Sequence, residues 1–222
     1  MTLDSLWKKP QFVIAFIAFL FLMFAALFLK VTDEVWLEQE TFLLDTTTSR
    51  LMATNHLHEP YSWRFFLIVT YLGNGVVLTA ASILITGLLW FYRSKRESLL
   101  FLGGFVLTGL AIVLFKLITS RIRPNGASFL NETSGAFPSG HAALSFYFFG
   151  FVGYLLSRTA NERSRSLLVF AGSLTLAGLI GISRIYLNVH WVSDVVAGFA
   201  LAAAVLCLCI GILETHKRGV LQ

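Results

Sequence analysis

Charged residues are scarce in this chain. Asp, Glu, Lys and Arg together make up 13% of the 222 residues, whereas roughly 25% is usual in soluble globular domains. The mean hydropathy is correspondingly high, at +0.75. Several runs of about 18 apolar residues contain no charge, which is typical of membrane spans. The composition therefore excludes an ordinary water-soluble domain and indicates an integral membrane protein.

Cysteine is almost absent as well. The two cysteines, Cys207 and Cys209, lie inside the last apolar run, and residues two apart on a helix point to different faces. We interpret both as apolar filler, so neither a disulfide nor a metal site is predicted there. The sequence also contains no CxxC or HExxH motif and no obvious group of carboxylates for Mg²⁺. We expect neither a metal ion nor a cofactor.

The chain has no basic patch, although its net charge is +5 and its pI is near 9.4. Its cations fall mostly between the apolar runs, where the preference of Lys and Arg for the cytoplasmic side explains them. Nucleic acid is therefore excluded as a partner, and membrane lipids are expected. The sequence shows no internal repeat, and this length leaves room for a single membrane domain, placed over residues 1–222.

Six apolar runs predict an all-α protein with six transmembrane helices. No small-x-small cleavage site follows the first run, so we expect a retained helix rather than a signal peptide. The fourth run is short for a core about 30 Å thick unless it takes residues from its flanks. The predicted spans are 12–29, 65–91, 99–117, 142–156, 167–183 and 195–213.

Residues 31–64 are too polar to span the membrane and form the one sizeable segment predicted outside it, with a short helix along the membrane surface. An even number of spans places both termini on one side. Ten of the 17 Lys and Arg residues fall on that side and seven on the other. The positive-inside rule therefore predicts cytoplasmic termini.

Polar residues gather at the outer ends of the predicted spans. Because successive helices alternate in direction, the ends of spans three and five and the starts of spans four and six face the same, extracytoplasmic side. These positions hold a lysine, two arginines, a serine–glycine–histidine turn and a histidine–aspartate pair: Lys116, Arg123, Arg184, Ser139, Gly140, His141, His190 and Asp194. We expect the active site at this face.

This set favours phosphate chemistry. Arg123 and Arg184 offer planar guanidinium groups that grip phosphate oxygens in pairs, and Lys116 adds a point charge. The turn at Ser139 and Gly140 leads into the N-terminus of a helix, where free backbone N–H groups and the helix dipole favour an anion. Three cations and such a turn at one membrane face therefore predict a phosphate site.

The two histidines supply a reaction. One can attack phosphorus as a nucleophile while the other protonates the leaving oxygen. Asp194 follows His190 by four residues, so on a helix it shares a face with His190 and can orient the ring. His141 has no carboxylate nearby in the sequence, which fits a proton donor better than a nucleophile.

Three stretches resemble the signature of the type 2 phosphatidic acid phosphatase family, which also includes vanadium haloperoxidases and bacterial lipid phosphatases. The stretches are Lys116-x6-Arg123-Pro124, Pro138-Ser139-Gly140-His141 and Ser183-Arg184-x5-His190-x3-Asp194. The resemblance covers roughly residues 65–213, the expected phosphatase core. It implies that His190 forms a phosphohistidine, that Asp194 orients it and that His141 is the general acid. The remaining five residues are implied to hold the phosphate.

The resemblance implies a membrane-bound, metal-independent lipid phosphatase in the cytoplasmic membrane of a bacterium. The expected substrate is phosphatidylglycerophosphate. Undecaprenyl pyrophosphate, or transfer of the phosphoryl group to another lipid, is the alternative at the same site. A non-catalytic lipid-phosphate binder or transporter is disfavoured, because a binder needs cations but no nucleophile.

Three further features have less specific interpretations. We interpret Arg121 as a solvated loop cation or a headgroup contact, and Trp191 as an interfacial anchor in preference to a part of the site. The polar notch at residues 73–75, Gly-Asn-Gly, is interpreted as a point of close helix packing in preference to a part of the cavity lining.

Overall fold

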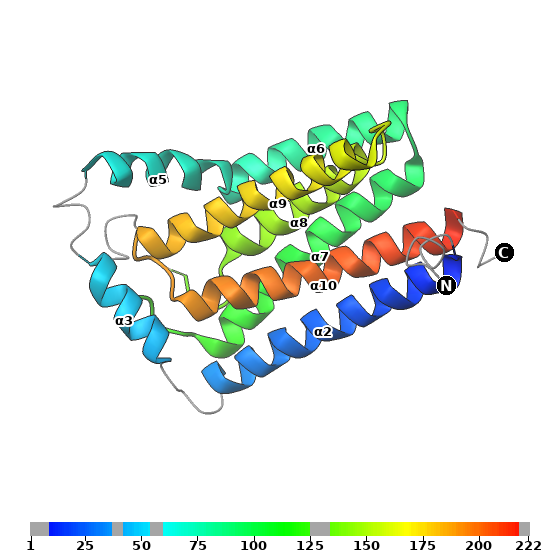
Figure 1. Cartoon of the computed structure of the whole chain (residues 1–222). Helices are drawn as coiled ribbons and strands as arrows, with labels where there is room; N and C mark the ends of the chain where they lie inside the picture. The colour runs from blue at the N-terminus through cyan, green and yellow to red at the C-terminus, as the bar shows by residue number, and fades with distance from the viewer. Residues whose placement is uncertain (1–8, 37–41, 54–59, 125–133, 218–222) are drawn as a thin grey trace.

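The computed structural model describes residues 9–36, 42–53, 60–124 and 134–217. This part of the chain contains eight helices and no strand, so the protein is all-α as predicted (Figure 1). In chain order the helices are α2 (Pro10–Trp36), α3 (Leu43–Met52), α5 (Pro60–Leu72), α6 (Gly75–Tyr92), α7 (Lys95–Thr119), α8 (Gly140–Ser157), α9 (Arg163–Tyr186) and α10 (Val192–Lys217).

Six of the described helices are long and apolar enough to cross a membrane: α2, α6, α7, α8, α9 and α10. This confirms the predicted number of spans. The short fourth span does take residues from its flanks, because α8 has 18 residues, from Gly140 to Ser157. At 1.5 Å per residue it is about 27 Å long, close to the thickness of the hydrocarbon core.

The predicted second span, 65–91, is wrong in its bounds, because the chain breaks there into two helices. The first helix, α5, ends at Leu72. Asn74 caps the next helix, because its side chain accepts hydrogen bonds from the backbone N–H groups of Val76 at 2.9 Å and Val77 at 3.5 Å. A Cβ on Gly73 would collide with Ile180 of α9, which confirms close packing at this notch. With 13 residues, α5 is about 20 Å long and does not cross, so α6 forms the span alone.

Residues 31–64 also do not form one separate segment. The first helix continues to Trp36, with Val31, Thr32 and Val35 buried against its neighbours. The predicted short helix is α3, and α5 begins within the same stretch. The segment therefore divides between the end of a span and two helices outside the six spans.

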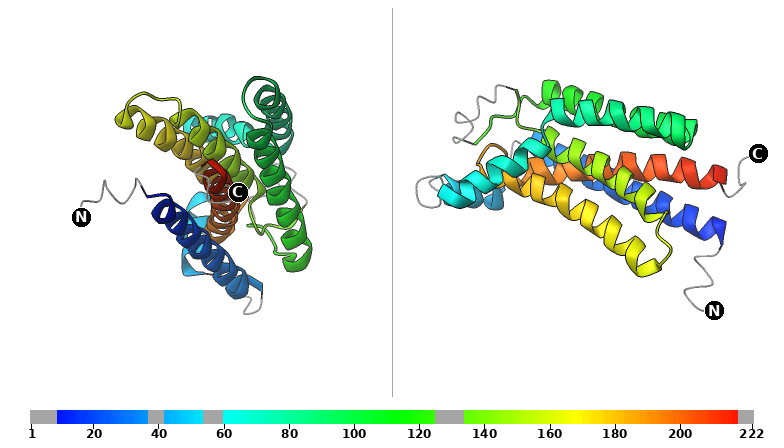
Figure 2. Two further views of the ribbon diagram at one scale, coloured as in Figure 1. Left: turned by 90° about the vertical axis from the view of Figure 1, so that its right-hand side faces the viewer. Right: turned by 90° about the horizontal axis from the view of Figure 1, so that it is seen from above.

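Two helices form the centre of the bundle. In the most apolar 18-residue stretch, 56% of the residues of α8 and 61% of those of α10 are buried, against 11% for α2. Figure 2 shows α10 with α2, α7, α8 and α9 around it. Aromatic rings fill the core between α7 and α8, where Phe101, Tyr147 and Phe151 are fully buried. The Tyr147 hydroxyl donates to the Leu100 carbonyl at 2.8 Å, which satisfies its polar end.

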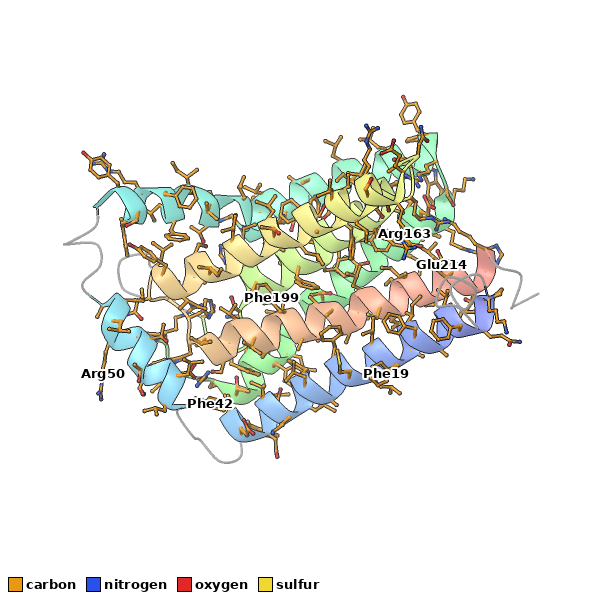
Figure 3. All side chains as sticks on the ribbon, viewed as in Figure 1. Phe19, Phe42, Arg50, Arg163, Phe199 and Glu214 are labelled. Carbon is orange, nitrogen blue, oxygen red and sulfur yellow. The ribbon has the colours of Figure 1, made fainter. Side chains whose placement is uncertain are left out.

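The bundle has two different polar ends. One, here called the α3 end, carries α3, α5, the ends of α7 and α9 and the starts of α8 and α10 (Figure 1). In Figure 3, Arg50 lies at this end, whereas Arg163 and Glu214 lie at the opposite end. At the opposite end a buried carboxylate, Glu97, pairs with Arg93 at 2.7 Å and with Lys217 at 2.6 Å. These ion pairs tie α6, α7 and α10 together.

Glu97→Ala should lower the thermal stability without changing catalysis. The substitution removes the partner of two cations that are about one-third exposed, so we expect a loss of about 1–2 kcal/mol, or about 2–8 °C in Tm. Thermal unfolding in detergent measures the shift. Glu162→Ala is the control, since Glu162 is exposed at the same end and its side chain makes no capping bond. If Glu97→Ala lowered kcat together with Tm, the expectation that this end of the bundle does not affect catalysis would be contradicted.

Candidate active site

A short loop at the α3 end sets the position of His190. After α9 the backbone N–H groups of Val189 and His190 both donate to the Arg184 carbonyl, at 3.1 and 3.3 Å. Asn188 has φ of 54°, in the left-handed region that Asn tolerates better than most residues. The chain thus reverses at once and brings His190, which is 3% exposed, next to the first turn of α10.

Asp194 contacts this histidine from the first turn of α10. His190 Nδ1 lies 3.4 Å from Asp194 Oδ2, and the same oxygen accepts the backbone N–H of Trp191 at 2.9 Å. The second contact is the back-bond of a capping box, in which an acidic side chain at the third helical position satisfies a free N–H at the start of the helix. The carboxylate, fully buried, is therefore held by its own helix.

Arg123 lies on the other side of the imidazole. Its Nη1 donates to His190 Nε2 at 3.1 Å and to the Val189 carbonyl at 2.9 Å. Its other nitrogens contact Ser134, with Nε donating to the carbonyl at 2.8 Å. Lys116, in the last turn of α7, donates to the Ser134 hydroxyl at 3.2 Å and to the Gly135 carbonyl. The two cations thus share one anchoring segment.

The turn at residues 139–141 packs directly onto α10. Ser139 is the N-cap of α8, and its side chain accepts from the Ala142 N–H at 3.5 Å. Its own backbone N–H donates to the Asp194 carbonyl at 3.0 Å. Gly198, one turn further along α10, makes this approach possible, because a Cβ there would lie 2.7 Å from the Ser139 carbonyl oxygen. The start of α8 is therefore fixed relative to Asp194.

Arg184 is buried in the last turn of α9, only 2% exposed. Its Nη1 donates to the Thr70 hydroxyl of α5 at 2.8 Å. The short helix α5 also packs Trp63, Phe66 and Leu67 against the loop that carries His190. One function of α5 is therefore to support both Arg184 and this loop.

The structure brings all eight predicted site residues together at the α3 end. Lys116, Arg123, Arg184 and His190 all act electrostatically on the His141 ring, and Gly140 lies between Ser139 and His141 at the start of α8. The cations and both histidines therefore surround one region at the start of α8.

Arg121 was interpreted wrongly from the sequence, and its neighbour Trp191 contacts it. The Arg121 side chain is only 11% exposed and forms ion pairs with Asp194 at 2.6 Å and with Asp45 at 3.0 Å. Trp191 lies beneath its guanidinium group, 5.7 Å from Cζ to the ring centroid, and donates to the Ile122 carbonyl at 2.9 Å. Both residues therefore belong to the surroundings of the site.

Sequence reasoning also missed Thr70 and Asp45. Thr70 carried a usable signal, because it is a polar residue inside an apolar run and such residues are commonly functional in membranes. Asp45 carried none, since its partner Ser193 is 148 positions away. Within the described residues no three His, Cys, Asp or Glu side chains form a group that could hold a metal ion.

The sequence model of the PAP2 superfamily matches residues 97–218, a range that contains all eight site residues. The chain belongs to the PAP2 superfamily. A curated member, phosphatidylglycerophosphatase B of Bacillus subtilis (strain 168), is 31% identical over 165 residues, which cover 73% of this chain and 80% of the relative.

Two solved PAP2-type structures share the fold. The transmembrane PAP2-type phosphatidylglycerolphosphate phosphatase from Bacillus subtilis superimposes with a TM-score of 0.78 at 27% identity, covering 89% of this chain and 98% of that one. LpxE from Aquifex aeolicus gives a TM-score of 0.56 at 27% identity, covering 80% and 98%. The chain is accordingly a multi-pass membrane phosphatase of the PAP2 superfamily.

Gly198→Ala should impair this PAP2 phosphatase although alanine is a better helix former than glycine. The new Cβ would force the start of α8 away from α10, and displacements of about 1 Å at a catalytic site cost up to about 100-fold in rate. We expect kcat/KM for a lipid phosphate to fall at least about tenfold. Gly178→Ala is the matched control, because a Cβ on Gly178 of α9 meets nothing within 4 Å. Equal activities of the two variants would refute this role of Gly198.

Proposed function

We propose that this phosphatase removes the terminal phosphate of phosphatidylglycerophosphate at the outer face of a bacterial cytoplasmic membrane. The observation that carries the proposal is the position of His190 between a carboxylate and a guanidinium group. Asp194 faces Nδ1 and Arg123 faces Nε2. An imidazole that donates its Nδ1–H to the carboxylate presents the Nε2 lone pair where Arg123 would bind a phosphate oxygen.

The reaction follows in two steps. In the first, His190 Nε2 forms a bond to phosphorus, the bond from phosphorus to the lipid oxygen breaks, and His141 gives a proton to that oxygen. In the second, water attacks phosphorus, its proton passes to His141, and the P–N bond breaks to release inorganic phosphate. Lys116, Arg123 and Arg184 stabilise the negative charge of the transferring group in both steps.

The choice of phosphatidylglycerophosphate rests on the relatives. The curated Bacillus subtilis protein is a phosphatidylglycerophosphatase by name, and the structure with the higher TM-score is a phosphatidylglycerolphosphate phosphatase. The orientation rests on the distribution of Lys and Arg, ten of which fall on the side of the termini. In this orientation both termini are cytoplasmic and the lipid headgroup reaches the α3 end from outside.

The two histidines should fail in different ways. His190→Ala removes the nucleophile, so hydrolysis of every substrate should fall by at least about 10³-fold. His141→Ala removes the proton donor, so hydrolysis of the lipid should fall about 10²–10⁴-fold. With p-nitrophenyl phosphate, whose leaving group needs no proton, the first step should be much less affected.

Rapid mixing and acid-labile phosphoprotein assays separate these outcomes. Wild type and His141→Ala should both trap a phosphohistidine with p-nitrophenyl phosphate, whereas His190→Ala should trap none. Phosphate release by His190→Ala at the wild-type rate would overturn the mechanism.

A panel of lipid phosphates tests the substrate. We expect kcat/KM for phosphatidylglycerophosphate to exceed that for undecaprenyl pyrophosphate and phosphatidate by at least about tenfold, which is 1.4 kcal/mol of transition-state binding. EDTA should leave each rate unchanged if no metal takes part. A preference for undecaprenyl pyrophosphate would assign the same site to recycling of the cell-wall lipid carrier. Transfer of phosphate to an added lipid alcohol instead of water would identify a phosphotransferase.

A further inference from the structure

Helix α3 inserts a carboxylate into the base of the site. Asp45 is 1% exposed, although it lies in the first turn of a helix whose other residues are mostly accessible. Its Oδ1 accepts the Ser193 N–H at 3.0 Å, and its Oδ2 accepts the Ser193 hydroxyl at 2.5 Å and Arg121 Nη2 at 3.0 Å. Among the described residues, the hydrogen bonds of this carboxylate are all directed at α10 or at Arg121.

Two carboxylates accept backbone N–H groups at the start of α10. The residue that precedes this helix, Trp191, has no side-chain oxygen to accept the free N–H groups of the first turn. Asp194 accepts one of them, that of Trp191, and Asp45 accepts another, that of Ser193. A carboxylate from a distant helix thus serves as the cap of the helix that carries Asp194.

Arg121 joins the two carboxylates. Its Nη1 donates to Asp194 Oδ1 at 2.6 Å and to the Ser193 hydroxyl at 2.7 Å, while its Nη2 donates to Asp45. The planar fork of a guanidinium group has the shape for such a bridge, and an ammonium group does not. Asp194 Oδ1 is therefore occupied by Arg121, which leaves Oδ2 for the Nδ1–H of His190.

The charges of this cluster suit the reaction. Two carboxylates and one guanidinium group give Asp45, Arg121 and Asp194 a net charge of −1. His190 becomes positively charged when it attacks phosphorus, so the cluster and the ring together become neutral at that moment.

We propose that Asp45 and Arg121 are positioning residues, which hold Asp194 in the orientation that directs His190 towards phosphorus. This inference rests on the proposed function of His190 and extends it. Arg121 is thereby distinguished from Arg123 and Arg184, because its guanidinium group is engaged by carboxylates and the phosphate is held by other cations.

Arg121→Gln and Asp45→Asn test the proposal. Each should lower kcat for the lipid phosphate by about 10–100-fold, the range expected for a misplaced catalytic group. The inhibition constant of inorganic phosphate should change by less than about twofold, because neither side chain contacts the anion. Arg121→Lys keeps the charge but cannot bridge both carboxylates, so its kcat should lie between those of wild type and Arg121→Gln.

The double variant separates positioning from independent effects. Asp45 and Arg121 act through the same carboxylate, so Asp45→Asn combined with Arg121→Gln should be no slower than the slower single variant. The matched controls are Arg50→Gln on α3 and Asp33→Asn on α2, both exposed. Arg50 points away from the bundle in Figure 3. Both controls should retain the wild-type kcat.

Three results would overturn the proposal. The first is a wild-type kcat in Arg121→Gln, and the second is a kcat loss that only follows the folded fraction measured by size-exclusion chromatography and thermal unfolding. The third is a parallel loss of phosphate inhibition, which would make Arg121 a phosphate ligand. None of these three results would contradict the proposed role of His190, since trapping of the phosphohistidine in the wild-type protein is measured separately.

Discussion

The contact between the start of α8 and the first turn of α10 is the constraint on which the site depends. A single main-chain hydrogen bond, from the Ser139 N–H to the Asp194 carbonyl, joins them at 3.0 Å. Gly198 permits the contact because it has no side chain. Through it the turn at residues 139–141 and the histidine–aspartate pair are joined, although they come from segments about fifty residues apart. Lys116, Arg123 and Arg184 lie around these two elements.

A membrane protein has few places where such a concentration of charge is tolerated. Charged groups in the hydrocarbon core are costly, and they are accepted where they face the protein interior and have partners. Four of these groups are nearly inaccessible here: His190, Arg184, Asp194 and Asp45. They lie at the ends of helices or, for His190, in the loop between two helices, where backbone N–H and C=O groups add further hydrogen bonds. The apolar side chains of the spans surround this end without interrupting it.

The eight site residues could be brought together from the sequence because alternation of helix direction sorts the ends of spans into two faces. The boundaries of the helices were harder to predict. The run 65–91 contains no charged residue, and hydropathy reports the environment of a residue and not the direction of the chain. The break between α5 and α6 was therefore visible only as a Gly-Asn-Gly notch. The contact between Asp45 and Arg121 could not be predicted, since the two residues are 76 positions apart and no local pattern joins them.

The long separations in this cluster have a consequence for biogenesis. A membrane chain is made and inserted from its N-terminus, so Asp45 and Arg121 are synthesised before Asp194 and Ser193, their partners on the last helix. Because both lie at a bundle end and not in mid-membrane, water can hydrate them in the interval. The free-energy cost of removing that water is offset only when α10 packs against these two side chains. Assembly of the cluster therefore requires α10, and a chain truncated before α10 lacks the partners of Asp45 and Arg121 on that helix.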